Sequence, residues 1–96
     1  MTQSTRQVVR EIRTAHAAVV ALTTIALLAR TELVPLHEER VRLARVVYEA
    51  GQSNVTPLRF AELDLLKAQL KVVQLEQRTA RAIIALDRAT GGAAQD

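Results

Sequence analysis

Gly51-Gln52-Ser53-Asn54-Val55-Thr56-Pro57 is the only turn-like cluster ahead of the last six residues of this chain. A glycine such as Gly51 suits the position just after a helix end, where the backbone often turns left-handed. Thr56 followed by Pro57 suits a helix N-cap and the first helical residue after it. The cluster therefore predicts that one helix ends and another begins here.

A regular apolar row precedes this turn. In alternating steps of four and three from Val8 to Ala50, twelve of thirteen positions are apolar, and the exception is Arg40. A heptad pattern sustained for this length predicts a long helix that packs along one side. The residues of this row that we expect to pack against the second helix include Leu22, Leu33, Leu36, Leu43 and Val47.

A second row follows the turn, with nine of ten positions apolar from Leu58 to Ala89. Its large members are Leu58, Leu65, Val72, Leu75 and Leu86. We expect helices over about residues 5–50 and 57–90, a tip at 51–56 and a flexible tail at 91–96. Residues 1–96 then form a single all-α domain, an antiparallel two-helix coiled-coil hairpin.

Pro35 lies inside the first expected helix, where a proline removes a hydrogen bond and clashes with the turn before it. Because Leu33 and Leu36 keep the apolar row in phase across it, we expect a kink, with a break into two shorter helices as the alternative. Arg40 either extends its guanidinium past the helix edge or pairs with an acid of a neighbouring helix.

Composition supports long helices and excludes several other classes. Of 96 residues, 49% are hydrophobic and 2% aromatic, with three glycines, two prolines and no cysteine. So few turn residues disfavour β-rich folds, and the lack of cysteine excludes disulfide scaffolds and thiolate zinc sites. The net charge of +3 comes from interleaved acids and bases, which is typical of a solvated helix face. We therefore expect no nucleic-acid partner.

The longest apolar run, Ala17 to Ala29, has 13 residues and is interrupted by Thr23 and Thr24. About 20 apolar residues are needed to cross a bilayer, so we expect no membrane span. Glu11 lies among the arginines that precede this run, which leaves no clear export signal.

No catalytic, cofactor or metal site is visible in the sequence. His16 and His37 are the only histidines, and on one helix they would lie about 31 Å apart. Ser53 has no base near it in sequence, and no glycine-rich loop has phosphate-binding spacing. We expect a protein that is not an enzyme and holds no cofactor.

Each expected helix also carries a second apolar row. In the first helix it consists of Val20, Leu27, Val34, Val41 and Tyr48. In the second it consists of Leu63, Leu66, Leu70, Val73, Ala80 and Ile84. A two-helix hairpin buries one row per helix, so we expect assembly into a larger helical bundle or barrel. A plain four-helix dimer is the alternative.

Several segments together resemble the TolC-type outer-membrane efflux factors over about residues 10–92. They are Leu33-Val-Pro35-Leu, Leu43-Ala-Arg-Val-Val-Tyr48-Glu-Ala-Gly51-Gln-Ser53, Leu58-Arg-Phe-Ala61-Glu-Leu and the closing Ala85-Leu-Asp-Arg-Ala-Thr-Gly-Gly92. Family members are several times longer and include β-strands, so this chain corresponds to a coiled-coil piece of one.

The resemblance implies a trimeric, all-helical periplasmic duct in an outer-membrane protein, with other copies or the rest of the channel as partners. It also implies that the turn meets a periplasmic adaptor in a tripartite efflux pump. The residues expected to bind the adaptor are Tyr48, Gly51, Gln52, Ser53, Asn54 and Val55.

Two other interpretations stay open. Small secreted hairpins of the Trp-x-Gly type match in length and topology, although Tyr48-Glu-Ala-Gly51 lacks the tryptophan. The other is a helical-bundle regulator or scaffold dimer with no role in efflux.

Overall fold

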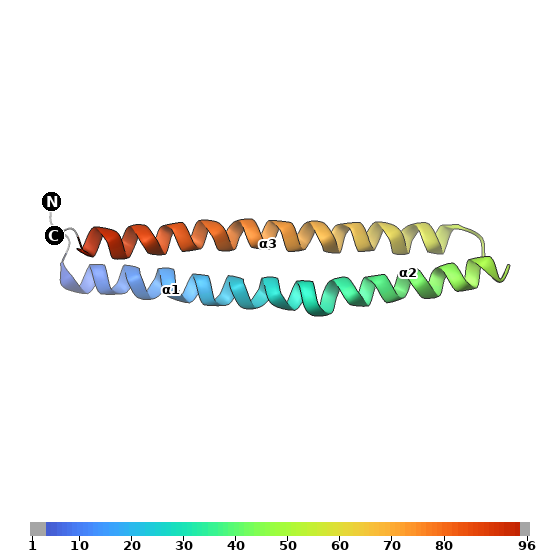
Figure 1. Ribbon diagram of the computed structural model, residues 1–96, viewed down its shortest axis with the longest axis horizontal. Coiled ribbons are helices and arrows are strands. Elements are labelled where there is room, and N and C mark those ends of the chain that lie inside the picture. The colour runs from blue at the N-terminus through green and yellow to red at the C-terminus, as the bar shows by residue number, and fades with distance from the viewer. Residues whose placement is uncertain (1–3, 95–96) are drawn as a thin grey trace. The chain divides into compact units, whose positions relative to one another are not determined.

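A computed structural model describes residues 4–94 of the chain, and 92% of these residues are helical with no strand among them. The elements are α1 (Thr5–Leu28), the π-helix η1 (Ala29–Leu33), α2 (Val34–Glu49) and α3 (Thr56–Ala94) (Figure 1). α1, η1 and α2 follow one another without a gap. The fold is all-α, and two long helical stretches, Thr5–Glu49 and Thr56–Ala94, pack against each other.

The chain divides into two compact units, and each unit contains a segment of both helical stretches. The first unit combines the residues up to Ala26 with those from Leu75 onward, and the second is Leu27–Gln74. Within each unit the two segments lie side by side (Figure 1). Among the described residues, Leu75 is buried in the first unit, and Ala29, Leu58, Ala68 and Val72 are buried in the second.

α1 starts at a reciprocal pair of side-chain caps. The Gln7 backbone N–H donates to Ser4 Oγ at 3.2 Å, and the Ser4 backbone N–H donates to Gln7 Oε1 at 3.1 Å. This capping box satisfies two of the backbone donors that a helix start leaves free.

In the first unit, the predicted apolar rows of α1 and α3 lie on the covered sides of these helices. In α1 the half-buried positions include Val8, Ile12, Ala15, Val19, Leu22 and Ala26. In α3, Leu75 is buried and Thr79, Ala82, Leu86 and Ala89 are half-buried. Heptad spacing therefore predicts correctly which sides of the two segments are covered here.

The π-helix η1 precedes Pro35 directly. The Val34 backbone N–H donates to the Ala29 carbonyl, five residues earlier. Leu33 and Val34 keep right-handed helical backbone angles, so the helix does not break at the proline. Pro35 offers no N–H to the carbonyl four residues before it, and its ring clashes with that carbonyl in a regular helix. A wider turn at this point relieves the clash.

The extra residue in the π-turn corrects the predicted packing row of α2. Leu36 is 48% exposed, Leu43 50% and Val47 38%, and Arg40 is also exposed. One added residue rotates the following helix by about 100°, which moves each inward position one residue along the chain. We call these four residues the Leu36 row.

A different set of residues takes the inward positions of α2. Val34, His37, Val41 and Ala44 are half-buried, and Tyr48, which continues their spacing, is 42% exposed. We call these five residues the Val34 row. Three of its members, Val34, Val41 and Tyr48, belong to the second apolar row noted in the sequence, so the π-turn exchanges the two rows.

α3 follows its predicted row without interruption in the second unit. Leu58, Ala68 and Val72 are buried, while Ala61 and Leu65 are half-buried. α3 continues past Gly91 to Ala94, so the helix ends later than the sequence predicts, within the segment from residue 91 predicted as a flexible tail. Residues 95 and 96 of that predicted tail lie outside the described residues.

Candidate functional site

The turn between α2 and α3 begins with a Schellman motif centred on glycine. The Gly51 N–H donates to the Tyr48 carbonyl at 2.9 Å, and the Gln52 N–H donates to the Val47 carbonyl at 3.1 Å. Gly51 has φ +74°, the left-handed conformation that this motif requires. The predicted role of Gly51 as the residue that ends the helix is therefore confirmed.

α3 begins at Thr56 itself, which corrects the prediction of Thr56 as the N-cap. Asn54 Oδ1 accepts a hydrogen bond from the Thr56 backbone N–H at 3.0 Å, and the Arg59 N–H already donates to the Val55 carbonyl at 3.0 Å. Because the Val55 carbonyl accepts the first hydrogen bond of α3, Val55 holds the N-cap position. The Asn54 side chain caps the first turn from one residue earlier, by satisfying the free Thr56 N–H. The Ser53 hydroxyl donates to the Asn54 carbonyl at 3.0 Å.

The six residues predicted from the sequence to bind a partner lie together at this turn. Tyr48, Gly51, Gln52 and Asn54 are exposed, whereas Ser53 and Val55 are half-buried. Phe60, the other aromatic residue, lies in the first turns of α3 and is 62% exposed. The turn is therefore a short segment with both helix ends capped and most of its side chains open to solvent.

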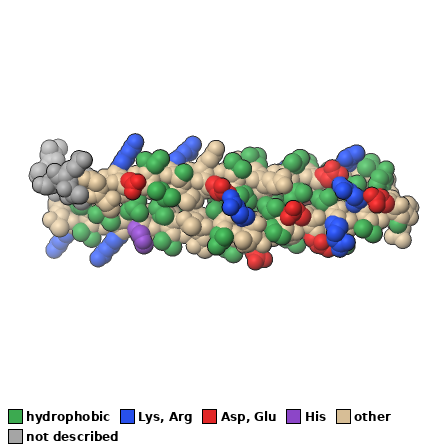
Figure 2. All heavy atoms as spheres, viewed as in Figure 1, with side chains coloured by type: hydrophobic (Ala, Val, Ile, Leu, Met, Phe, Trp, Pro, Cys, Tyr) green, Lys and Arg blue, Asp and Glu red, His purple; other side chains and the backbone are tan. Residues whose placement is uncertain are grey.

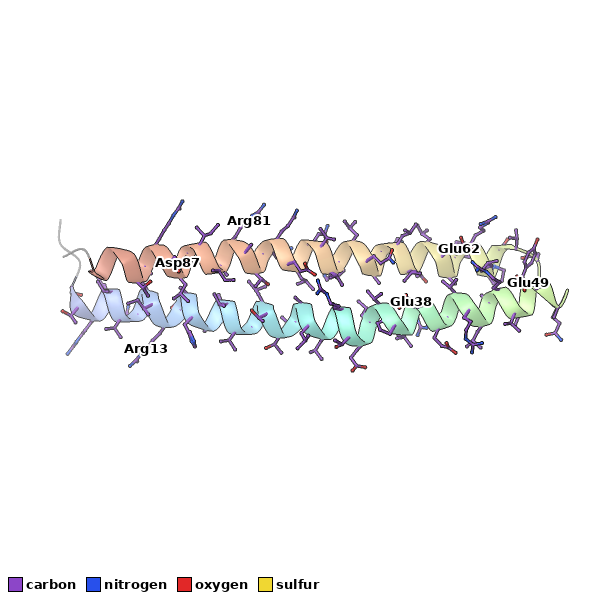
Figure 3. The ribbon with its side chains drawn as sticks, viewed as in Figure 1. Arg13, Glu38, Glu49, Glu62, Arg81 and Asp87 are labelled. Atoms are coloured by element: carbon purple, nitrogen blue, oxygen red, sulfur yellow. The ribbon has the colours of Figure 1, made fainter. Side chains whose placement is uncertain are left out.

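Charged side chains near the turn alternate in sign. Glu49 and Glu62 lie on α2 and α3 on either side of the turn (Figure 3). Arg59 Nη1 lies 3.4 Å from Glu62 Oε2. Figure 2 shows acidic and basic side chains interleaved with apolar ones over the second unit. This pattern gives the turn no dominant charge to attract a polyanion or a polycation.

One well-aligned ion pair lies on the exposed side of α2. Arg42 donates to both Glu39 carboxylate oxygens, from Nη2 at 2.6 Å and from Nε at 2.9 Å. The hydrogen bonds from Arg42 hold the pKa of Glu39 below its ordinary value of 4.5. The same pair raises the pKa of Arg42. The pair is solvated, so it stabilises one turn of helix only modestly.

Two sets of large apolar side chains are left uncovered in the second unit. On α3 they recur at steps of three and four: Leu63 is 46% exposed, Leu66 62%, Leu70 56% and Val73 51%. On α2 they are the apolar members of the Leu36 row. Exposed apolar patches are typical of surfaces that contact another protein, a membrane or a ligand.

The structure brings no metal-binding set together. Within residues 4–94, no group of three or more histidine, cysteine, aspartate or glutamate side chains is placed to hold an ion. His16 is exposed, and His37 lies in the Val34 row with its Nδ1 buried and without a hydrogen-bond partner.

Averaged hydropathy changes the membrane expectation drawn from the longest apolar run. Among the described residues, Thr5–Glu49 contains an 18-residue window of mean hydropathy 1.7, of which 6% is buried. By length and composition alone this helix could cross a membrane. Thr23 and Thr24 interrupt the apolar run, but their hydroxyl groups do not lower the average enough to exclude it, and Thr24 Oγ1 bonds within the helix to the Val20 carbonyl at 2.8 Å.

No protein-family model, curated protein sequence or solved structure matches this chain. The candidate site therefore rests on the geometry of the turn and on the uncovered apolar rows.

Sequence reasoning missed the π-turn and the exact cap of α3. Pro35 was the available signal for the first, because a proline inside a helix must be relieved by a break, a kink or a widened turn. Asn54 was the signal for the second, since an asparagine side chain readily accepts a hydrogen bond from the backbone N–H two residues later.

Proposed function

We propose that this chain is a non-enzymatic, antiparallel two-helix hairpin of the TolC type. It packs beside other helices as part of a periplasmic duct and docks a periplasmic adaptor through its turn in a tripartite export pump. The observation that carries the proposal is the turn, which is capped at both ends and exposes Tyr48, Gly51, Gln52 and Asn54.

The geometry of the turn suits docking because its backbone is already ordered. The Schellman motif and the Asn54 cap fix the chain before any partner arrives, so binding costs little conformational entropy there. An added Cβ at Gly51 would meet no atom within 4 Å. The space beside Gly51 is thus open to a partner's own backbone or side chain.

The uncovered apolar rows support assembly with further helices. Leu63, Leu66, Leu70 and Val73 repeat at coiled-coil spacing and are all about half exposed. A helix whose two sides are both apolar is stable in water when both sides are covered. This requirement fits a duct in which each helix has a neighbour on either side.

The test compares tip variants for binding to an immobilised periplasmic adaptor from a tripartite pump, measured by surface plasmon resonance. Gly51→Asp puts a charged side chain into the open space of the turn, and Tyr48→Ala removes the exposed ring. We expect each to weaken binding by about tenfold or more, as for residues central to an interface. Circular dichroism should show unchanged helix content in both.

Phe60→Ala is the matched control, because it removes from outside the turn a ring that is more exposed than that of Tyr48, 62% against 42%. It should change the affinity by less than about twofold. Adaptor binding that is unaffected by both tip variants, or absent in the parent chain, would contradict the proposal.

A free-standing self-associating hairpin is the second candidate, and the same α3 row favours it. Four half-exposed apolar residues at steps of three and four are enough for a dimeric four-helix bundle. Light scattering separates the candidates, since one chain has a mass of 10.6 kDa. A dimer that binds no adaptor supports the second candidate over the first.

A further inference from the structure

We propose that residues 29–49 are a two-state element, in which the π-turn at Ala29–Leu33 decides which of two apolar rows of α2 is buried. With the π-turn present, the Val34 row lies inward, as the structure has it. Without it, α2 rotates by about 100° and the Leu36 row takes the inward positions. This inference concerns the helix itself and does not depend on the proposed function.

The two rows are alternative because they differ by one residue in register. Leu36 and His37, Arg40 and Val41, and Leu43 and Ala44 are neighbours in sequence. A π-turn holds one more residue than an α-turn, so gaining or losing it exchanges each residue with its neighbour. The row on α1 keeps its phase in both states, because it lies ahead of η1.

Each row would be an acceptable packing face. The Leu36 row offers two leucines and a valine with one polar residue, Arg40, whereas the Val34 row offers two valines, an alanine and a tyrosine with His37. In the second unit, α3 presents an unbroken series of small and branched apolar residues from Leu58 to Val72. Either the Leu36 row or the Val34 row of α2 can pack against such a series, because apolar side chains of similar volume substitute for one another in a core.

Opposing interactions keep the two states comparable in energy. Pro35 favours the π-turn, because in a regular helix its ring would clash with the Thr31 carbonyl four residues earlier. Arg40 favours it as well, since the alternative state would bring its charge inward.

Two features of the observed state favour the alternative state, in which the π-turn is absent. His37 Nδ1 is buried with no hydrogen-bond partner, and an unsatisfied buried polar atom is costly. Leu36 and Leu43 remain about half exposed, so their burial is a gain available only to the alternative state.

The exchange changes what α2 shows to a partner. In the observed state the surface carries Leu36, Arg40 and Leu43, and in the alternative state it carries His37, Val41 and Ala44. A partner that binds one surface better shifts the population toward that state by its differential affinity. The element would therefore couple binding at α2 to the helical turn that precedes Pro35.

Thiol labelling of the whole chain tests this directly, because the sequence contains no native cysteine. Val41→Cys reports on the Val34 row and Leu43→Cys on the Leu36 row, each introduced alone and alkylated with iodoacetamide. In the parent background, Cys substituted at 43 should react about tenfold faster than Cys substituted at 41. In the double variant Pro35→Ala with Arg40→Leu, which favours the regular helix and an apolar Leu36 row, this ratio should reverse.

Two controls separate register from general loosening of the helix. Pro35→Ala with deletion of Thr31 also gives a regular helix, but it removes the extra residue, so the Val34 row stays inward and the parent ratio should persist. The variant Pro35→Ala with Arg42→Leu also adds a leucine, but at a position outside both rows. Its labelling ratio should therefore reverse less than that of the variant Pro35→Ala with Arg40→Leu. Circular dichroism should show full helix content throughout.

An unchanged labelling ratio in the variant with Pro35→Ala and Arg40→Leu overturns the proposal. A reversed ratio in the Thr31 deletion overturns it as well, because the rotation would then not follow the residue count of the turn.

Discussion

Gly51 offers the sharpest test of the turn, because its energy can be worked out from the backbone alone. Its φ of +74° is left-handed, and an added Cβ would meet no atom within 4 Å. Gly51→Ala therefore adds backbone strain and no steric clash, at a cost of about 1–2 kcal/mol. Reduced freedom of the unfolded chain returns about 0.4–1 kcal/mol of this, which leaves a net loss near 1 kcal/mol. Gly51→Asn should cost less, since asparagine enters this conformation more readily.

Thermal unfolding followed by circular dichroism measures the difference. For a chain of this size, 1 kcal/mol corresponds to a Tm shift of about 4–8 °C. We expect Gly51→Ala to lower Tm by that amount and Gly51→Asn to fall between alanine and the parent. Gly91→Ala is the control, because that glycine lies within α3 without a positive φ and a Cβ there also meets nothing within 4 Å. An alanine at 51 that leaves Tm unchanged, or an asparagine that lowers it more than alanine, would refute the reasoning.

Two further predictions concern polar contacts of the second unit. Asn54→Ala removes the side-chain cap of α3 and should lower the free energy of unfolding by about 1 kcal/mol. Thr56→Ala should lower it less, because Thr56 contributes only its backbone N–H to that bond. Chemical denaturation of both variants measures the difference. The carboxyl of Glu39 should titrate below 4.5, so the small stabilisation from its pair is present above the ordinary pKa and is lost as pH falls through the lowered one. A carbon-13 titration checks this, and Arg42→Ala should return the pKa of Glu39 toward its ordinary value.

Heptad spacing predicts most of the helix packing, because burial of one side of a helix depends on periodicity more than on side-chain detail. Val8 to Leu33 and Leu58 to Leu75 lie where their spacing places them. The prediction is wrong only from Leu36 to Val47, where one extra residue in a turn displaces every later position. A periodic pattern carries no information about such an insertion unless the pattern itself shifts.

The structure of the turn is predicted from the sequence about as well as the helix packing is. Gly51 is identified because left-handed backbone strongly selects glycine. The N-cap is misplaced by one residue because Asn54 and Thr56 are both good capping residues, and the side-chain cap comes from Asn54 although the N-cap position itself is held by Val55. The continuation of α3 through Gly91 to Ala94 was missed for a related reason, since glycine lowers helix propensity by about 1 kcal/mol without forbidding the helix.

The failure at Leu36 and the proposed two-state element have one physical origin. The Leu36 row keeps the phase of the α1 row, so the sequence alone favours it, while the Val34 row is apolar enough to replace it. Had residues 34, 41 and 48 been charged, the spacing would have determined the register and the π-turn would have had no competing packing to select. Because both rows are apolar, the register is set by a local feature, Pro35, rather than by the pattern along the helix. A register held by Pro35 and the charge of Arg40 is also a register that two substitutions or one bound partner would change, and thiol labelling at 41 and 43 measures that change.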